Sequence, residues 1–200
     1  MPIPAFLEGV KTNLTYWQRQ AGGLDIQGFK RLDLDRQNLH RAIHTGLAFS
    51  ETSTHAADLA MGLFDFIEWG GYWREWIPVL ETVLDNIHHM PDTRIRLLNQ
   101  LGFLHMLNRQ IAEGMKRHQE AETLALEADH RFGIANACFG ISNLHYQAHQ
   151  YEMADHYGQK ALRLFLQETE QKRKQASVLN LLGMICHAQG AYPQAEDYLS

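Results

Sequence analysis

The stretch LNLLGMICHAQGAYPQAEDYL, Leu179–Leu199, predicts one helix, a tight glycine turn and the start of a second helix. Its small residues recur upstream at a nearly fixed spacing, because Gly62, Gly102, Ser142 and Gly183 lie 40, 40 and 41 residues apart. Self-similarity at a period of this size is the signature of stacked helical repeats. The sequence therefore predicts an all-α fold, a right-handed α-solenoid of antiparallel helix pairs.

Small residues are expected where the two helices of a pair cross, because helices approach closely only where side chains are short. A larger side chain at such a crossing would overpack it at a cost of about 1–3 kcal/mol. The expected crossings pair a first-helix residue with a second-helix residue: Gly102 with Gly114, Ser142 with Ala154, and Gly183 with Ala195.

The chain is expected to divide into an N-terminal segment, residues 1–52, and an array of four helix pairs, residues 53–200, the last of them truncated. Amphipathic patterns in the N-terminal segment predict a pair of helices at 3–21 and about 33–48, which we expect to cap the array. Because the sequence stops at Ser200 within a helix, we expect its C-terminal end to expose apolar residues and to self-associate. The array helices are expected at about 56–68 and 73–87, 93–108 and 112–127, 131–148 and 151–168, and 174–189 and from 192 onward.

The composition and charge of the chain narrow its possible functions. A net charge of −5 argues against binding to nucleic acid or to an anionic membrane, since basic surface drives both. No apolar run is long enough to span a membrane or to act as a secretory signal, so we expect a cytoplasmic protein. Cys138 and Cys186 fall at positions expected to be buried, where a thiol serves as a small core residue.

The chain has 12 histidines, which invite a metal or catalytic interpretation. His40 with His44, and His145 with His149, are each four residues apart on an expected helix, a spacing that can hold one metal ion between two rings. Neither pair has a Cys or His nearby to complete a tetrahedral set, so no metal site is predicted. His105 lies 40 residues before His145, which favours packing or a hydrogen bond between helices at a shared repeat position.

Motifs that carry catalysis or bind a nucleotide are missing from the sequence. No G-x-S-x-G motif, paired Cys and His context or cluster of carboxylates occurs. Gly23 and Gly28 have the spacing of a phosphate-binding loop, but Phe29 stands where that loop needs Lys, and no strand is expected before it. The sequence therefore predicts a protein that is not an enzyme and has no cofactor.

The repeat, with Tyr151 and Tyr192 three residues before an alanine, resembles the tetratricopeptide repeat (TPR) in a form of about 40 residues. Upstream, Leu34–Ile43 (LDRQNLHRAI) followed by Glu68–Glu75 (EWGGYWRE) resembles a junction found in bacterial STAND-type signalling ATPases. In that family, a helix of this kind leads from the nucleotide-binding and winged-helix part into a TPR sensor array. The ATPase itself is absent from this sequence. The resemblance therefore implies the sensor or scaffold part of a bacterial signalling or regulatory protein.

In a TPR array, the first helices line a concave groove, and residues three and six before the small crossing residue, and one and four after it, point into that groove. Amide side chains alternate there with aromatic or Met side chains, as an extended peptide or protein segment would need. The same count from Gly62 reaches only apolar residues, which we expect the N-terminal helices to cover. The resemblance thus implies a ligand groove formed by Arg96, Asn99, Phe103, Met106, Asn136, Phe139, Asn143, Tyr146, Ser177, Asn180, Met184 and His187.

Two alternatives to a peptide-binding groove stay open. The amides can instead serve only to satisfy neighbouring helices, which would leave a structural or oligomerisation scaffold without a specific ligand. An apolar, self-complementary surface would favour that scaffold. A small-molecule sensor is the third option, and it would need an enclosed pocket.

Overall fold

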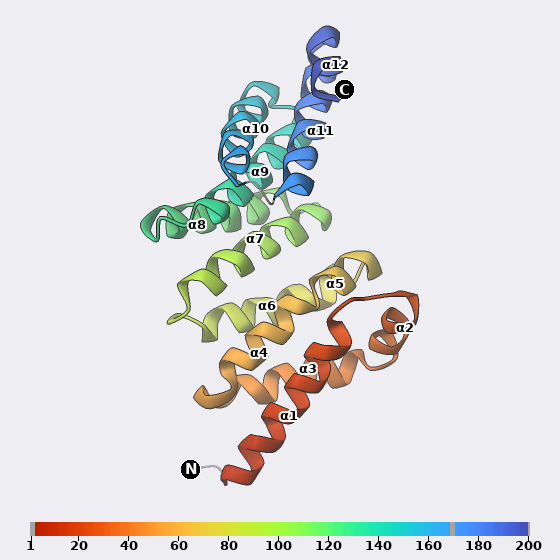
Figure 1. The fold of residues 1–200 in the computed structure, drawn as a ribbon, viewed down its shortest axis with the longest axis vertical. Helices are drawn as coiled ribbons and strands as arrows, with labels where there is room; N and C mark the ends of the chain where they lie inside the picture. Colours follow the sequence, from red (N-terminus) through yellow and green to blue (C-terminus); the bar gives the residue numbers. More distant parts are fainter. Residues whose placement is uncertain (1–2, 169–170, 200) are drawn as a thin grey trace. The chain divides into compact units, whose positions relative to one another are not determined.

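The computed structural model describes residues 3–168 and 171–199, and every regular element within those ranges is a helix (Figure 1). The predicted fold class, all-α with antiparallel TPR-like helix pairs, is confirmed. The helices are α1 (Pro4–Ala21), α2 (Ile26–Leu34), α3 (Arg36–Leu47), α4 (Ser50–Gly62), α5 (Phe64–Gly70), α6 (Trp73–Asn86), α7 (Pro91–Leu107), α8 (Ile111–Glu127), α9 (Arg131–Gln147), α10 (Tyr151–Leu166), α11 (Lys172–Ala188) and α12 (Tyr192–Leu199).

The chain forms two compact units, residues 1–97 and residues 98–200, and the division falls inside α7. The first unit holds α1 to α6 with the start of α7, and the second holds the rest of α7 with α8 to α12. The division predicted at residue 52, between a capping pair and an array, stays a prediction. Ser200, where we expected the array to stop, lies outside the described residues.

Short turns that contain a left-handed residue join the helix pairs of the second unit. Arg109, His149 and Gly190 have φ angles of 59°, 58° and 79°, and each lies two residues after a first helix ends, namely α7, α9 and α11. A residue with positive φ at this position ends the helix and turns the chain toward its antiparallel partner. Two of the three residues, Arg109 and His149, are not glycine. The left-handed turn at this repeat position therefore forms even where glycine's conformational freedom is lacking.

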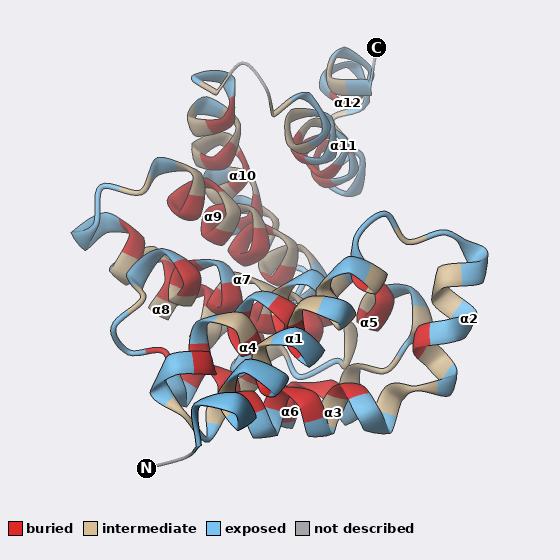
Figure 2. Ribbon diagram, turned by 60° about the horizontal axis from the view of Figure 1, so that its bottom comes forward, coloured by how far each residue is buried: buried red, intermediate tan, exposed pale blue. Residues whose placement is uncertain are grey.

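α9 lies at the centre of the second unit, because both α8 and α10 pack against it. Its buried residues run along most of its length (Figure 2), which leaves only one face of the helix near the surface. Cys138 of α9 and Cys186 of α11 are both buried free thiols, as the sequence predicts. The buried residues of α9 are Gly133, Ile134, Ala135, Ala137, Cys138, Gly140, Ile141, Ser142 and Leu144.

Two of the three predicted crossings of the second unit, Gly102 with Gly114 and Ser142 with Ala154, are confirmed by close contacts. A Cβ atom added to Gly114 would lie 3.0 Å from the carbonyl oxygen of Gly102. The Ser142 hydroxyl donates a hydrogen bond of 2.6 Å to the carbonyl oxygen of Ala154. At the last pair, a Cβ atom added to Gly183 would lie 2.8 Å from the Leu199 side chain, and the predicted pairing of Gly183 with Ala195 stays a prediction. Short residues at these positions therefore let the helices of each pair approach.

Gly62 does not belong to this set, and its predicted role at a fourth crossing is wrong. A Cβ atom added to Gly62 would meet no atom within 4 Å, so the glycine does not allow a close approach. The predicted helix at 56–68 is also interrupted, because α4 ends at Gly62 and α5 begins at Phe64. Leu63, at φ −84° and ψ 2°, breaks the helix between them, and it is fully buried. Core packing of Leu63 and Phe66 thus overrides the repeat spacing here.

The first unit also contains a short helix, α2, in a stretch that the sequence left between two predicted helices. The Asp25 carboxylate caps α2 by accepting a hydrogen bond of 2.6 Å from the Gly28 N–H. A polar cluster connects the end of α2 and the start of α3 to α6. Arg36 forms an ion pair of 2.8 Å with Glu75 and lies 4.3 Å above the ring of Tyr72, whose hydroxyl donates a hydrogen bond to Asp33.

Several aromatic residues lie around the turn between α5 and α6 and pack against the helices before it. Trp76 is fully buried, and its ring lies edge-on to that of His40, 4.3 Å away between centroids. The ring of Phe29 lies 5.1 Å from that of Phe66. Trp69 differs, because it is 64% exposed. Most of this aromatic group therefore belongs to the core of the first unit, and Trp69 does not.

Candidate functional site

A row of four half-buried side chains follows the surface face of α9. Asn136, Phe139, Asn143 and Tyr146 are three, four and three residues apart, which places them on one side of the helix. We call these four residues the α9 stripe. Most other residues of α9 are buried, and the helix packs on α8 and α10, so the stripe is a part of α9 that a ligand can reach.

Each asparagine of the α9 stripe is anchored by its own helix. The Asn136 Nδ2 donates a hydrogen bond of 2.8 Å to the Phe132 carbonyl oxygen, and the Asn143 Nδ2 donates one of 3.0 Å to the Phe139 carbonyl oxygen. A side-chain amide has two N–H donors and an oxygen with two lone pairs. Each amide thus keeps one N–H and its oxygen available, in an orientation that the helix has already fixed.

The α11 residues implied as groove positions are all exposed. The Ser177 hydroxyl donates a hydrogen bond of 3.0 Å to the Arg173 carbonyl oxygen of its own helix. The Asn180 Nδ2 lies 3.8 Å from the Met184 sulfur, and the His187 ring lies edge-on to that of Tyr192 at 5.3 Å between centroids. α11 therefore offers a second set of accessible polar and soft side chains.

The α7 residues implied as groove positions are mostly used by the fold. The Asn99 Nδ2 donates a hydrogen bond of 3.3 Å to the Gly133 carbonyl oxygen, and its Oδ1 lies 3.1 Å from the His118 Nδ1. Met106 is only 7% exposed, whereas Phe103 is half-buried. Arg96 is exposed, but it lies on the part of α7 that belongs to the first unit. Within the second unit, α7 adds only Phe103 to the accessible set.

His118 is a buried polar residue that repeat counting did not single out. Its side chain is 3% exposed, and its ring lies between two glycines of neighbouring helices. A Cβ atom added to Gly102 would lie 2.6 Å from the His118 ring, and one added to Gly140 would lie 2.2 Å from it. Burial lowers the pKa of His118 to about 4, so the imidazole is neutral near pH 7. Its Nε2 has no hydrogen-bond partner among the described residues.

A second polar group links α8 and α10 across α9. Lys160 Nζ forms an ion pair of 2.5 Å with Glu122 Oε1, and the Cys138 sulfur lies 3.6 Å from the same carboxylate oxygen. Burial, together with the Glu122 carboxylate, raises the pKa of Cys138 to about 12. A thiol that stays protonated is a poor nucleophile, so this group serves packing rather than covalent chemistry.

The repeated histidines have the hydrogen-bonding role that their spacing predicts. The Nδ1 of His105 lies 2.8 Å from the Gln110 side-chain oxygen, and the Nδ1 of His145 lies 2.6 Å from that of Gln150. Each bond connects the end of a first helix to the residue before the second helix. Across residues 3–168 and 171–199, no group of three His, Cys, Asp or Glu side chains could hold a metal ion. In the same ranges, no helix is both long and apolar enough to cross a bilayer.

Comparison with known proteins supports a TPR module. Residues 139–200 match the tetratricopeptide repeat family. No curated protein matches the sequence. TPR repeats are generally non-catalytic modules for protein interaction, which act through the surfaces that stacked helix pairs present.

Solved structures of low sequence identity share the fold. BtubC (BKLC) from P. vanneervenii is 14% identical with a TM-score of 0.68, and the match covers 96% of this chain and 86% of BtubC. RapI in its apo form is 11% identical with a TM-score of 0.67, covering 99% of this chain and 64% of RapI. The TPR-like repeats of a kinesin light chain from Podosopora anserina are 12% identical with a TM-score of 0.64, covering 100% and 94%. At these identities, the likeness concerns the fold alone.

Proposed function

We propose that this chain is a non-catalytic, peptide-binding TPR module and that the α9 stripe is the centre of its binding surface. The α9 stripe itself is the observation that carries this proposal. Two amides and two aromatic rings lie half-buried along one side of α9, where the Tyr146 ring also lies 6.0 Å from that of Tyr151 at the start of α10.

The chemistry of the stripe suits an extended peptide. The free N–H of Asn136 or Asn143 can donate to a peptide carbonyl oxygen, and the side-chain oxygen can accept from a peptide N–H. Phe139 and Tyr146 alternate with these amides and provide flat surfaces for apolar side chains of the ligand. Because the helix already holds both amides in place, little side-chain entropy is lost when the peptide binds.

The proposal extends to the setting in which the module works. The segments Leu34–Ile43 and Glu68–Glu75 resemble the region that leads into the sensor array of bacterial STAND-type ATPases. We therefore assign this chain to the sensor or scaffold part of a bacterial signalling protein that acts in the cytoplasm. In that role, occupation of the α9 stripe by a protein or peptide segment is the signal that is passed on to an effector.

The experiment starts from a peptide selected with this chain out of a random peptide library displayed on phage. The dissociation constant of the selected peptide is then measured by fluorescence anisotropy for the protein and for Asn136→Ala, Asn143→Ala and Asn180→Ala. Each substitution removes one amide contact and is expected to weaken binding by about 0.5–1.5 kcal/mol, which is roughly 2- to 12-fold.

Gln119→Ala is the matched control, because Gln119 is an exposed amide on α8 away from the stripe. The control protein should bind the peptide as the unchanged protein does, and all variants should melt within a few degrees of it. The proposal fails if the selection yields no peptide, or if the three asparagine variants bind as tightly as the control.

A scaffold without a specific ligand is the second candidate, and exposed apolar residues of α11 and α12 favour it. Met184, Tyr192 and Leu199 are large apolar side chains that remain exposed there. Exposed apolar surface of this kind marks contacts between proteins. Self-association through this end is the form that such a scaffold would take.

A further inference from the structure

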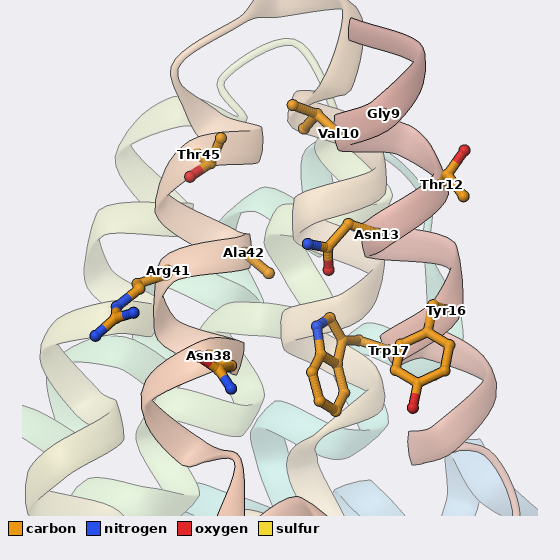
Figure 3. A pocket seen from close by; sticks show the side chains of 10 residues that line it. All are labelled: Gly9, Val10, Thr12, Asn13, Tyr16, Trp17, Asn38, Arg41, Ala42 and Thr45. Carbon is orange, nitrogen blue, oxygen red and sulfur yellow. The ribbon is translucent and has the colours of Figure 1, made fainter. Parts of the chain in front are cut away.

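A pocket in the first unit lies between α1 and α3 and is separate from the proposed peptide surface. Its volume is about 670 Å³, and pockets that take small molecules commonly measure about 300–1,000 Å³. In Figure 3, Asn13 and Trp17 point from α1 toward α3, and Asn38 and Ala42 point back from α3. The pocket therefore has walls from two helices.

Short residues and the packing of α1 create this space. Val10 and Leu14 of α1 are buried, and α1 packs extensively against α4. Toward the pocket, Gly9 and Ala42 contribute little volume, and a Cβ atom added to Gly9 would meet no atom within 4 Å. α1 contacts both α3 and α4, and the small residues Gly9 and Ala42 leave space between α1 and α3 at this level.

The pocket combines a flat apolar wall with hydrogen-bond donors. The Trp17 ring is half-buried and is steadied by Tyr16, whose ring lies edge-on at 4.9 Å between centroids. Neither the Trp17 indole N–H nor the Asn13 amide has a hydrogen-bond partner among the described residues. The Asn38 Nδ2 is occupied, because it donates a hydrogen bond of 2.8 Å to Asp35. The Trp17 indole N–H and the N–H groups of the Asn13 amide are therefore donors that a ligand in this space can use.

The charge at the pocket is positive although the chain as a whole carries −5. Arg41 lies at the rim on α3, where its side chain points away from α1 (Figure 3). It has no ion pair or hydrogen bond with any described residue, and no acidic side chain lines the pocket. A long, unpaired guanidinium can fold over the mouth and bind a carboxylate with two parallel hydrogen bonds.

We infer that the α1–α3 pocket binds a small planar aromatic acid. The ring of such a ligand packs on Trp17, and the donors of Asn13 and Trp17 face its oxygen atoms. Its carboxylate lies at the mouth, where Arg41 pairs with it. Because the pocket lies in the first unit, this inference goes beyond the proposed peptide binding and stands or falls independently of it.

The test uses isothermal titration calorimetry of the full chain with indole-3-acetate and with salicylate. The uncharged counterparts, indole-3-acetamide and salicylamide, are titrated in parallel. At least one of the two acids is expected to bind, and its amide is expected to bind at least about tenfold more weakly because the pair with Arg41 is lost. If neither acid binds at millimolar concentrations, or if acid and amide bind equally, the inference is overturned.

Substitutions then place the bound acid. Arg41→Gln is expected to weaken binding of the acid about tenfold, whereas Arg19→Gln, at an exposed arginine of α1 outside the pocket, leaves it unchanged.

Trp17→Leu is expected to abolish measurable binding, and Trp69→Leu is its control. Because Trp17 contributes to packing, circular dichroism melting checks the fold, and Asn13→Ala provides an exposed substitution that should weaken binding by a few-fold. Equal binding by Arg41→Gln and Arg19→Gln, or by Asn13→Ala and the unchanged protein, would overturn the assignment of the acid to this pocket.

Discussion

The ring of His118 fills the space that two glycines leave open at the centre of the second unit. Gly102 on α7 and Gly140 on α9 both contact the ring closely enough that neither can carry a Cβ atom without a shift. Repeat positions explain the choice of residues, because the position of His118 is occupied by Gly158 and then by Leu199 in the following repeats. Where this position holds a large residue, the facing first helix has a glycine: His118 lies against Gly102, and Leu199 lies against Gly183. Where the position holds Gly158, the facing residue is the larger Ser142.

Gly140→Ala is expected to destabilise the protein by about 1–3 kcal/mol, because the new Cβ atom would lie 2.2 Å from the His118 ring. The free energy of unfolding is measured by urea titration with circular dichroism. In a His118→Ala background the same substitution should cost clearly less, since the ring is gone. Gly9→Ala is the control, because its Cβ atom would meet open space, and it should be neutral or stabilise α1 by up to about 1 kcal/mol. Equal costs in both backgrounds would contradict the proposed fit.

Acid is expected to weaken the fold through His118. Its pKa is lowered from 6.5 to about 4 in the folded protein. Between these two values the unfolded chain binds a proton at this site and the folded chain does not, so stability is present above pH 6.5 and falls as the pH decreases toward 4. The full loss is about 3 kcal/mol. His118→Gln cannot titrate, so its free energy of unfolding should change less between pH 7 and pH 5, and an identical change in both proteins would argue against a buried neutral histidine.

At the scale of helices, the sequence predicts the second unit better than the first. Arg109, His149 and Gly190 stand at one repeat position, and the pairs that they join follow the predicted pattern closely. In the first unit, the repeat spacing does not reveal that Leu63 breaks a helix to reach the core. α2 was missed because it has only 9 residues and buries only Leu32, which gives too short a pattern to set it apart from the predicted helix that follows.

The end formed by α11 and α12 is expected to mediate weak self-association. Leu199 of α12 is 59% exposed, and Met184 of α11 and Tyr192 of α12 are exposed as well. Sedimentation velocity should show an average mass that rises with concentration, and Leu199→Gln should reduce this rise by removing apolar contact area. Leu166→Gln is the matched control, since Leu166 on α10 is also 59% exposed. A chain that stays monomeric at high concentration, or equal effects of both substitutions, would contradict the expectation.

At the scale of the whole chain, the α9 stripe of the second unit and the α1–α3 pocket of the first unit differ in how far the sequence could predict them. The α9 stripe follows from counting along one helix from Ser142, so its residues could be named in advance. Asn99 fills the place on α7 that Phe139 fills on α9, 40 residues later. Its amide is held by His118 and Gly133, which come from two other helices. The α1–α3 pocket depends on the distance between two helices, and a repeat spacing in the sequence does not predict that distance.

The central claim is that a peptide binds across the α9 stripe, and nuclear magnetic resonance of the protein labelled with nitrogen-15 tests it most directly. The selected peptide is titrated into the full chain, and backbone and asparagine side-chain amide signals are followed. The largest shifts are expected at the side chains of Asn136 and Asn143 and at the backbone of Tyr146, because these groups lie on the exposed face of α9. Largest shifts at Gln119 and its exposed neighbours on α8, with the asparagine signals unmoved, would contradict the claim.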